Sequence, residues 1–230
     1  MMDSLSQGLI GATVWVLPIL LAITLHEAAH GFAALKFGDD TALRAGRVSL
    51  NPLRHVDLFG TILLPALLLI VSSPFLFGYA KPVPVDFSRL NTPRRDMVWV
   101  AIAGPATNIV LALISAVLLH AALLAPAWAA PWLIANLSNS ILINVILAIF
   151  NMLPLPPLDG GRVAVGLLPD RLAFPLARLE RFGFGILIGA MFLLPYLGSK
   201  LGLELNIFRW LVGIPTNYMI QLIATLTGHG

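Results

Sequence analysis

The chain has 230 residues, of which 58% are apolar and 11% are charged, and its mean hydropathy is +0.90. Soluble domains carry about 25% charged residues, so this composition argues against a soluble globular protein and against a disordered chain. The net charge of +3, without a basic stripe, argues against nucleic-acid binding. The absence of cysteine excludes disulfides, thiolate metal sites and a catalytic cysteine. An integral membrane protein remains, with length for five or six spans.

Long runs without a charged side chain predict where the chain crosses the membrane. The first run, residues 4–25, is long enough for a span, since about 20 apolar residues cross a bilayer. The second, residues 58–78, contains glycine and two prolines and has basic clusters on both sides, so we expect a re-entrant hairpin there. Residues 44–50 and 82–87 alternate weakly between apolar and polar, which favours short strands beside it.

The remaining spans follow from the later runs. Residues 97–158, uncharged apart from His120, are long enough for two spans, and a Pro/Trp-rich turn at 125–132 separates them. Later spans are predicted at 96–125, 132–155, 182–199 and 206–227. The chain is thus expected to be an all-α polytopic membrane protein, forming a single domain over residues 1–230.

Lys and Arg residues predict the orientation of these spans, because such residues stay on the cytoplasmic side. They form three clusters, which follow the apolar segments at 4–25, 58–78 and 132–155 in turn: Arg44, Arg47 and Arg54; Lys81, Arg89, Arg94 and Arg95; Arg162, Arg171, Arg178 and Arg181. The Trp-rich turn is then expected outside. The first span would end at the inner face, the span at 96–125 would begin there, and the span at 132–155 would return to it.

A metal-binding motif ends the first span. The residues His26-Glu27-Ala28-Ala29-His30 form H-E-x-x-H, which on a helix puts two imidazoles on one face. Two such imidazoles can bind one Zn²⁺, and Glu27 lies close enough to act as a general base. Zinc lowers the pKa of a bound water to about 7 and polarises a carbonyl group. The alternative interpretation is a pair of interfacial histidines beside a solvated carboxylate.

A catalytic zinc site needs a third protein ligand, and Asp159 is the better candidate. It ends the longest uncharged run and, by the orientation argument, reaches the same membrane level as His26 and His30. Three prolines in residues 154–157 precede it and two glycines follow it, which suits a rigid loop that aims one side chain. Asp159 would otherwise cap the helix that follows. His55 is a weaker candidate, since a surface or substrate-groove role suits it better.

Together these motifs resemble the site-2 protease family of intramembrane zinc metalloproteases. The resemblance rests on His26-Glu27-Ala28-Ala29-His30, on Gly104-Pro105-Ala106-Thr107-Asn108 in the next span, and on Asn151 to Gly160 in the third. Their order and membrane level match that family's three-span core, and the likeness covers about residues 8–165. Residues 51–57 and 78–85 resemble its compact bacterial branch, which has no PDZ or CBS domain.

The resemblance implies a function and a set of site residues. His26, His30 and Asp159 would bind one Zn²⁺, and Glu27 would be the catalytic acid and base. Asn151 would donate to the developing oxyanion, or else satisfy backbone groups released by the prolines after it.

Two residues of the middle span are expected to serve helix packing. Gly104 and Asn108 share one helix face. There the glycine permits close contact and the asparagine can bond to a neighbouring helix.

The expected partner is a transmembrane protein substrate, cleaved in or near its membrane segment, with the bilayer around both proteins and no nucleic acid. The location implied is a bacterial inner membrane, with the site near the cytoplasmic face. A divalent-metal transporter is the main alternative, but transport requires polar groups staged across the membrane. A catalytically inactive membrane adaptor is another, and an intact Glu27 argues against it. The sequence leaves the oligomeric state open.

Overall fold

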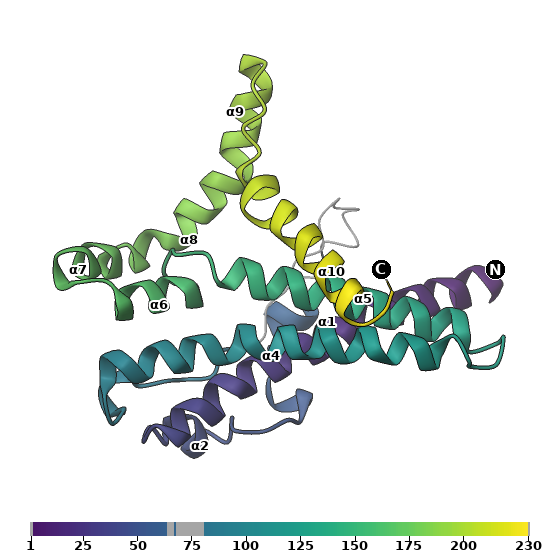
Figure 1. The fold of residues 1–230 in the computed structure, drawn as a ribbon, viewed down its shortest axis with the longest axis horizontal. Coiled ribbons are helices and arrows are strands. Elements are labelled where there is room, and N and C mark those ends of the chain that lie inside the picture. Colours follow the sequence, from purple (N-terminus) through teal and green to yellow (C-terminus); the bar gives the residue numbers. More distant parts are fainter. Residues whose placement is uncertain (1, 64–66, 68–80, 230) are drawn as a thin grey trace.

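The computed structural model describes residues 2–63, 67 and 81–229 (Figure 1). In this part of the chain every regular element is helical, so the predicted all-α membrane class is confirmed. Four helices there are long and apolar enough to cross a membrane: Thr13–Lys36, Pro93–Ala122, Ala130–Asn151 and Glu180–Leu201. The expected total of five or six spans stays a prediction. Of the expected hairpin at 58–78, residues 58–63 form a π-helical turn, and nearly all the rest lies outside the described residues.

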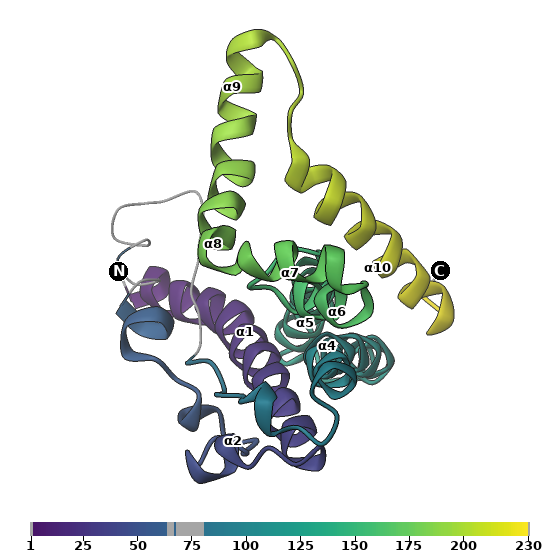
Figure 2. The same ribbon diagram turned by 90° about the vertical axis from the view of Figure 1, so that its left-hand side faces the viewer.

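Three long helices form the centre of the molecule. Helices α1 (Met2–Lys36), α4 (Pro93–Ala122) and α5 (Ala130–Asn151) pack against one another along their lengths (Figures 1 and 2). The turn between α4 and α5 lies at the same end as the N-terminus of α1. Here Trp128 is 86% exposed, and the Trp132 indole donates to Thr13 Oγ1 at 2.9 Å. The predicted turn is thereby confirmed.

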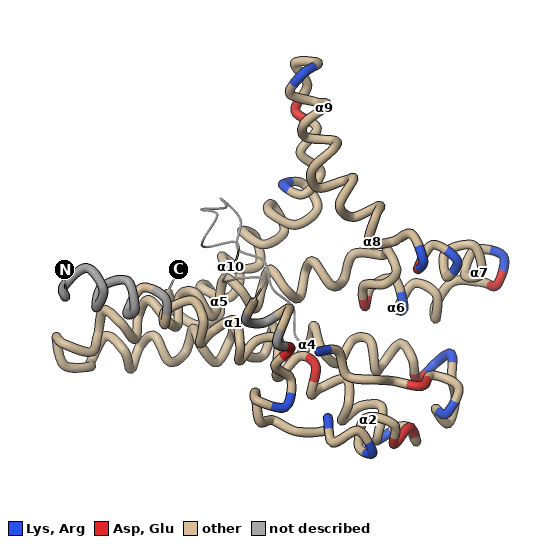
Figure 3. Tube along the Cα trace, turned by 180° about the vertical axis from the view of Figure 1, so that it is seen from behind, with Lys and Arg blue, Asp and Glu red and all other residues tan. Residues whose placement is uncertain are grey.

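Charged residues gather at the other end of this bundle (Figure 3). They lie on α2 (Thr41–Arg44), α6 (Asp159–Leu167) and α7 (Asp170–Arg178), and at the start of α4. Charged groups avoid the hydrocarbon core of a bilayer, so this end of the bundle is the one expected to meet water.

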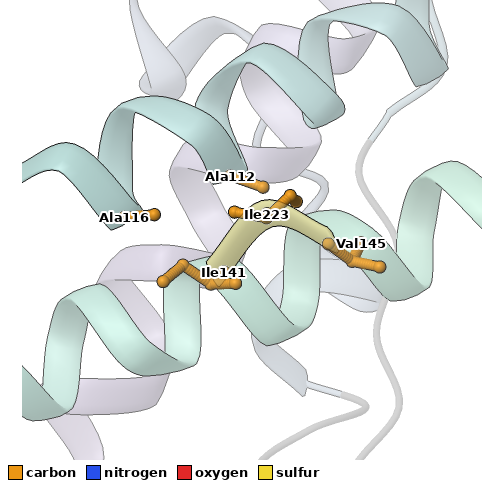
Figure 4. Close-up of a cluster of buried hydrophobic side chains, with 5 residues drawn as sticks. All are labelled: Ala112, Ala116, Ile141, Val145 and Ile223. Atoms are coloured by element: carbon orange, nitrogen blue, oxygen red, sulfur yellow. The ribbon is translucent and has the colours of Figure 1, made fainter. Parts of the chain in front are cut away.

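The bundle core is built from small and branched apolar side chains. Ala112 and Ala116 of α4 face Ile141 and Val145 of α5, and Ile223 of α10 (Ile214–Leu226) covers them (Figure 4). Alanines let helix backbones approach closely, which is how helices associate where lipid removes the usual hydrophobic drive. The α4–α5 contact is therefore tight enough to hold side chains of the two helices at fixed separations.

The segment after α7 leaves the bundle. Helix α8 (Glu180–Ile188), a π-helical turn (Gly189–Leu193) and α9 (Leu194–Leu201) form one continuous helix. This helix points away from α1, α4 and α5, and the chain returns through a second π-helical turn (Arg209–Gly213) into α10 (Figures 1 and 2). The expected spans at 182–199 and 206–227 are both helical, but the first does not run beside the bundle.

The prediction of short strands is not met in the described residues. Residues 44–50 form the end of α2, a turn and a loop. Residues 82–87 form an irregular stretch that leads into a 3₁₀ helix (Phe87–Arg89). The reason lies in the backbone donors. The Val83 amide donates to Glu27 Oε2 and the Asp86 amide to Asp39 Oδ2, so carboxylates replace the neighbouring strand. Two prolines in the stretch have no donor to offer.

Candidate metal centre

Three potential ligand atoms meet where α1 passes the start of α6. His26 Nε2 and His30 Nε2 lie 3.0 Å apart, and Asp159 Oδ2 is 3.2 Å and 3.4 Å from them. Both histidines are nearly buried, and their four-residue spacing on α1 puts them on one face. Among the described residues no other cluster of His, Cys, Asp and Glu side chains could hold a metal ion. The fold therefore brings Asp159 next to two histidines that precede it by 129 and 133 positions in the sequence.

The hydrogen bonds of both imidazoles fix which nitrogen faces this cluster. His30 Nδ1 is 2.7 Å from the Val100 carbonyl oxygen, which can only accept, so Nδ1 bears the proton. His26 Nδ1 is 2.6 Å from Asn108 Oδ1. The Asn108 amide nitrogen donates to Ala22 O and Asn144 Oδ1, so its oxygen faces His26, and His26 Nδ1 must bear the proton. In their neutral forms both rings thus turn an Nε2 lone pair toward the shared point.

This arrangement fits a bound cation. Two lone pairs and a carboxylate oxygen face one another at close range, which is repulsive unless a positive charge lies between them. Asp159 Oδ2 is buried, and no hydrogen-bond donor reaches it from the described residues. Two imidazole nitrogens and one carboxylate oxygen also form a donor set typical of catalytic Zn²⁺, which keeps a fourth position open.

Helix α4 leaves room for the cluster through a glycine. A Cβ atom on Gly104 would lie 2.5 Å from His30 Nε2 and 2.7 Å from His26 Nε2. Any side chain there would occupy the space where the two ligand atoms converge. The close approach expected of Gly104 therefore serves the site as well as the helix packing.

Asp159 reaches the cluster because its loop is packed tightly. It is the first residue of α6, and Leu158 precedes it as the cap position, so the capping role considered for Asp159 is not what the structure has. A Cβ on Gly160 or Gly161 would collide with the loop backbone at 152–156, so both must be glycine.

The far end of α6 is held by Arg94 of α4. Its guanidinium donates to the Gly166 carbonyl at 3.1 Å and to the Leu168 carbonyl, and pairs with Asp170 at 2.6 Å. Arg94 thereby satisfies carbonyl groups at the C-terminus of α6, where a cation is also favoured by the helix dipole. The helix that presents Asp159 is thus fixed at both ends.

Glu27 is positioned by the irregular stretch at 81–86, which precedes the 3₁₀ helix Phe87–Arg89. Its Oε2 accepts the Val83 amide at 2.8 Å. Val83 is 8% exposed, and it packs over Gly31, where a Cβ would lie 3.2 Å from Val83 Cγ1. Since Pro82 and Pro84 lack an amide hydrogen, the Val83 amide is the one donor of this three-residue stretch.

The other sequence candidates do not join the cluster. His55 is buried and its Nε2 bonds the Ser49 carbonyl at 2.8 Å. Asn151 donates to the Leu147 carbonyl of its own helix at 3.0 Å, and its role at the oxyanion stays a prediction.

Sequence reasoning missed three contacts that shape the site: Asn108 to His26, Asn144 to Asn108, and Val83 to Glu27. Two asparagines inside an otherwise apolar run were the signal for the first two, since polar groups at membrane depth are costly.

Known proteins with similar sequences are described as zinc metalloproteases. Peptidase family M50 matches residues 123–194. The "Putative zinc metalloprotease YwhC" of Bacillus subtilis is 40% identical over 188 residues, which cover 80% of this chain and 81% of that protein. The "Putative zinc metalloprotease Rip2" of Mycobacterium tuberculosis is 31% identical over 198 residues, covering 84% and 73%. Its namesake in Mycolicibacterium smegmatis is 31% identical over 170 residues, covering 74% and 62%. No solved structure matches the chain. The chain therefore belongs to peptidase family M50, the site-2 protease family, and is a membrane-embedded zinc metalloprotease.

Proposed function

We propose that this metalloprotease cleaves a peptide bond in, or at the edge of, the transmembrane segment of another membrane protein. The main support is the location of the His26, His30 and Asp159 cluster, which lies between α1 and α6 where apolar spanning helices meet the charged end of the bundle. A substrate that reaches the cluster from within the bilayer would be a membrane segment.

The residues take separate roles in this proposal. His26, His30 and Asp159 hold Zn²⁺, which when bound supplies a Lewis acid for the scissile carbonyl and acidifies water. Glu27 accepts a proton from the attacking water and delivers it to the leaving amine. The Val83 amide occupies Oε2 of Glu27, so it leaves the other oxygen as the candidate proton acceptor and fixes the carboxylate in position.

The irregular stretch at 82–86 is the proposed docking segment for the substrate. A peptide bond inside a helix is shielded, so the substrate must unwind, and an extended peptide can add to an exposed backbone edge. Residues 81–86 lie beside Glu27 and form neither helix nor strand. Because Pro82 and Pro84 lack an amide hydrogen, each offers a carbonyl acceptor without an amide donor of its own. Substrate amide groups could bond there.

An apolar cavity beside the Asp159 loop gives a second contact surface. Its volume is about 210 Å³, and it lies between the end of α5 with its following loop and the segments around Ala190 and Phe208. We propose that apolar residues of the substrate next to the cleaved bond occupy it. We also propose that the charged end of the bundle, where Lys and Arg residues gather, faces the cytoplasm of a bacterial cell, because basic residues favour that side of a membrane.

A metal transporter fits the structure less well. The described part of α4 and α5 does contain a line of polar residues beyond His26, but these are neutral amides and hydroxyls bonded to one another. No second cluster of metal-binding side chains occurs in the described residues. A transported ion would have no further ligands of comparable strength, whereas hydrolysis needs one site.

The proposal is tested with Glu27→Gln and wild type, purified in detergent and given a synthetic transmembrane peptide. Glu27→Gln is expected to retain one zinc per chain and to lose cleavage, because the amide cannot accept the proton. Glu204→Gln, at an exposed carboxylate on the distant loop before α10, is the matched control and should cleave normally. Cleavage by Glu27→Gln at the wild-type rate would refute the assignment. Wild type without zinc after metal-controlled purification would refute the site.

A further inference from the structure

A continuous line of hydrogen bonds leads from His26 into the α4–α5 contact. His26 Nδ1 bonds Asn108 Oδ1 at 2.6 Å, and Asn108 Nδ2 donates to Asn144 Oδ1 at 2.7 Å. Asn144 Nδ2 donates to the Ser140 carbonyl at 2.9 Å and approaches Ser140 Oγ at 3.2 Å. Ser140 Oγ then meets Ser115 Oγ at 2.8 Å.

These side chains are deeply buried in spanning helices. Asn108 is 0% exposed, Asn144 1% and Ser115 6%. An apolar residue at any of these positions would avoid the desolvation of a polar group at membrane depth. Ser115 and Ser140 suffice to join the two helices by a hydrogen bond. The two amides, which lie nearer His26, need a further explanation.

The line has a fixed polarity, and a backbone carbonyl sets it. The Ser140 carbonyl can only accept, so the Asn144 amide must turn its nitrogen toward it and its oxygen toward Asn108. Asn108 must then turn its nitrogen toward Asn144 and its oxygen toward His26. An oxygen at that position can only accept, so His26 bears its proton on Nδ1 and turns the Nε2 lone pair to the metal cluster.

An inverted Asn108 amide would have the opposite effect. Its nitrogen would donate to His26 Nδ1, the ring proton would move to Nε2, and a protonated Nε2 cannot bind a metal. The Ala22 carbonyl, at 3.3 Å, is the other acceptor that holds the Asn108 nitrogen in place, and it is the more distant one. Asn144 is therefore the stronger constraint on the orientation of Asn108.

We propose that Asn144 is a positioning residue for the zinc ligand His26, acting through Asn108 to fix the ring tautomer that binds zinc. The proposal rests on the proposed zinc site. It assigns no proton transfer to the line, because amide groups do not relay protons in a single orientation. A partner of a zinc-binding histidine typically changes metal affinity by about 10–100-fold when it is replaced.

The test compares Asn144→Leu with wild type and with Ser115→Ala. Ser115→Ala removes a hydrogen bond of the same helix contact and leaves the Asn108–Asn144 bond intact, so it controls for helix packing. Zinc affinity is measured by competition with a chelator. We expect Asn144→Leu to bind zinc about tenfold more weakly and Ser115→Ala to match wild type.

The tautomer is measured separately on zinc-free protein with ¹⁵N-labelled histidine. We expect Nδ1–H at His26 in wild type and in Ser115→Ala, and a mixture with Nε2–H in Asn144→Leu. Asn144→Ala serves the same comparison should the leucine variant not fold. Wild-type zinc affinity and tautomer in the Asn144 variants would overturn this proposal alone, as would an equal loss of affinity in Ser115→Ala. No zinc in wild type would overturn the proposed function as well.

Discussion

Replacing Gly104 by alanine should abolish zinc binding through a single methyl group. The added Cβ would lie 2.5 Å from His30 Nε2, 2.6 Å from His26 Cε1 and 2.7 Å from His26 Nε2. Ordinary van der Waals contact begins at 3.4 Å, so the His30 ring would have to retreat by about 0.9 Å. Zinc–nitrogen bonds tolerate only about 0.2 Å of deviation. The methyl group would also occupy the space of the ion.

Loss of one residue that supports a metal ligand costs about 10–100-fold in affinity. Gly104→Ala displaces two ligands themselves, so the expected loss of zinc affinity exceeds about 100-fold. Overpacking should cost about 1–3 kcal/mol, offset in part by about 1 kcal/mol from replacing glycine in a helix. Zinc content by mass spectrometry and thermal unfolding separate the two effects. Gly185→Ala is the matched control, because nothing lies within 4 Å of its added Cβ. Stoichiometric zinc in Gly104→Ala at wild-type affinity would refute the geometry of the site.

Two further predictions concern the segments around the site. Val83→Pro removes the amide that holds Glu27 and should lower kcat about tenfold or more, with zinc content unchanged. Val83→Ala keeps the amide and should lower kcat less. Equal kcat values in the two variants would contradict a positioning role for the Val83 amide. Burial raises the pKa of Asp39, but hydrogen bonds from Thr41 and the Asp86 amide outweigh it and lower the pKa below its ordinary value. Its ionised form therefore favours folding above pH about 4, and this stability is lost as pH falls toward the lower pKa. Asp39→Asn should flatten the acid side of an unfolding profile against pH, and an unchanged profile would show that Asp39 does not contribute.

The parts of the site that the sequence predicts are those set by one-dimensional rules. His26, Glu27 and His30 follow from the helical period, which puts residues four apart on one face. Asp159 follows from the alternating direction of spans, because that alternation returns the end of α5 to the level of the first motif. Both rules depend on chain order and length, so no tertiary contact has to be known in advance.

The remaining parts depend on contacts between segments that no local pattern specifies. An asparagine in an apolar helix indicates that some bond exists, but not whether its oxygen or its nitrogen faces the partner. For Asn108 that choice depends on Asn144, 36 residues later. The weak alternation at 82–87 predicts a strand, but it could not indicate that carboxylates of Glu27 and Asp39 would take the place of a partner strand.

Backbone carbonyls ultimately orient both zinc-facing histidines. His30 bonds Val100 O directly, and His26 depends on Ser140 O through two amides. A helical carbonyl in an apolar bundle cannot rotate or exchange its partner for water, whereas a side-chain acceptor could do either. This explains how a chain with so few charged residues can present two neutral imidazoles in the metal-binding tautomer. Neutral amides are sufficient because their direction is fixed at one end by a group that can only accept.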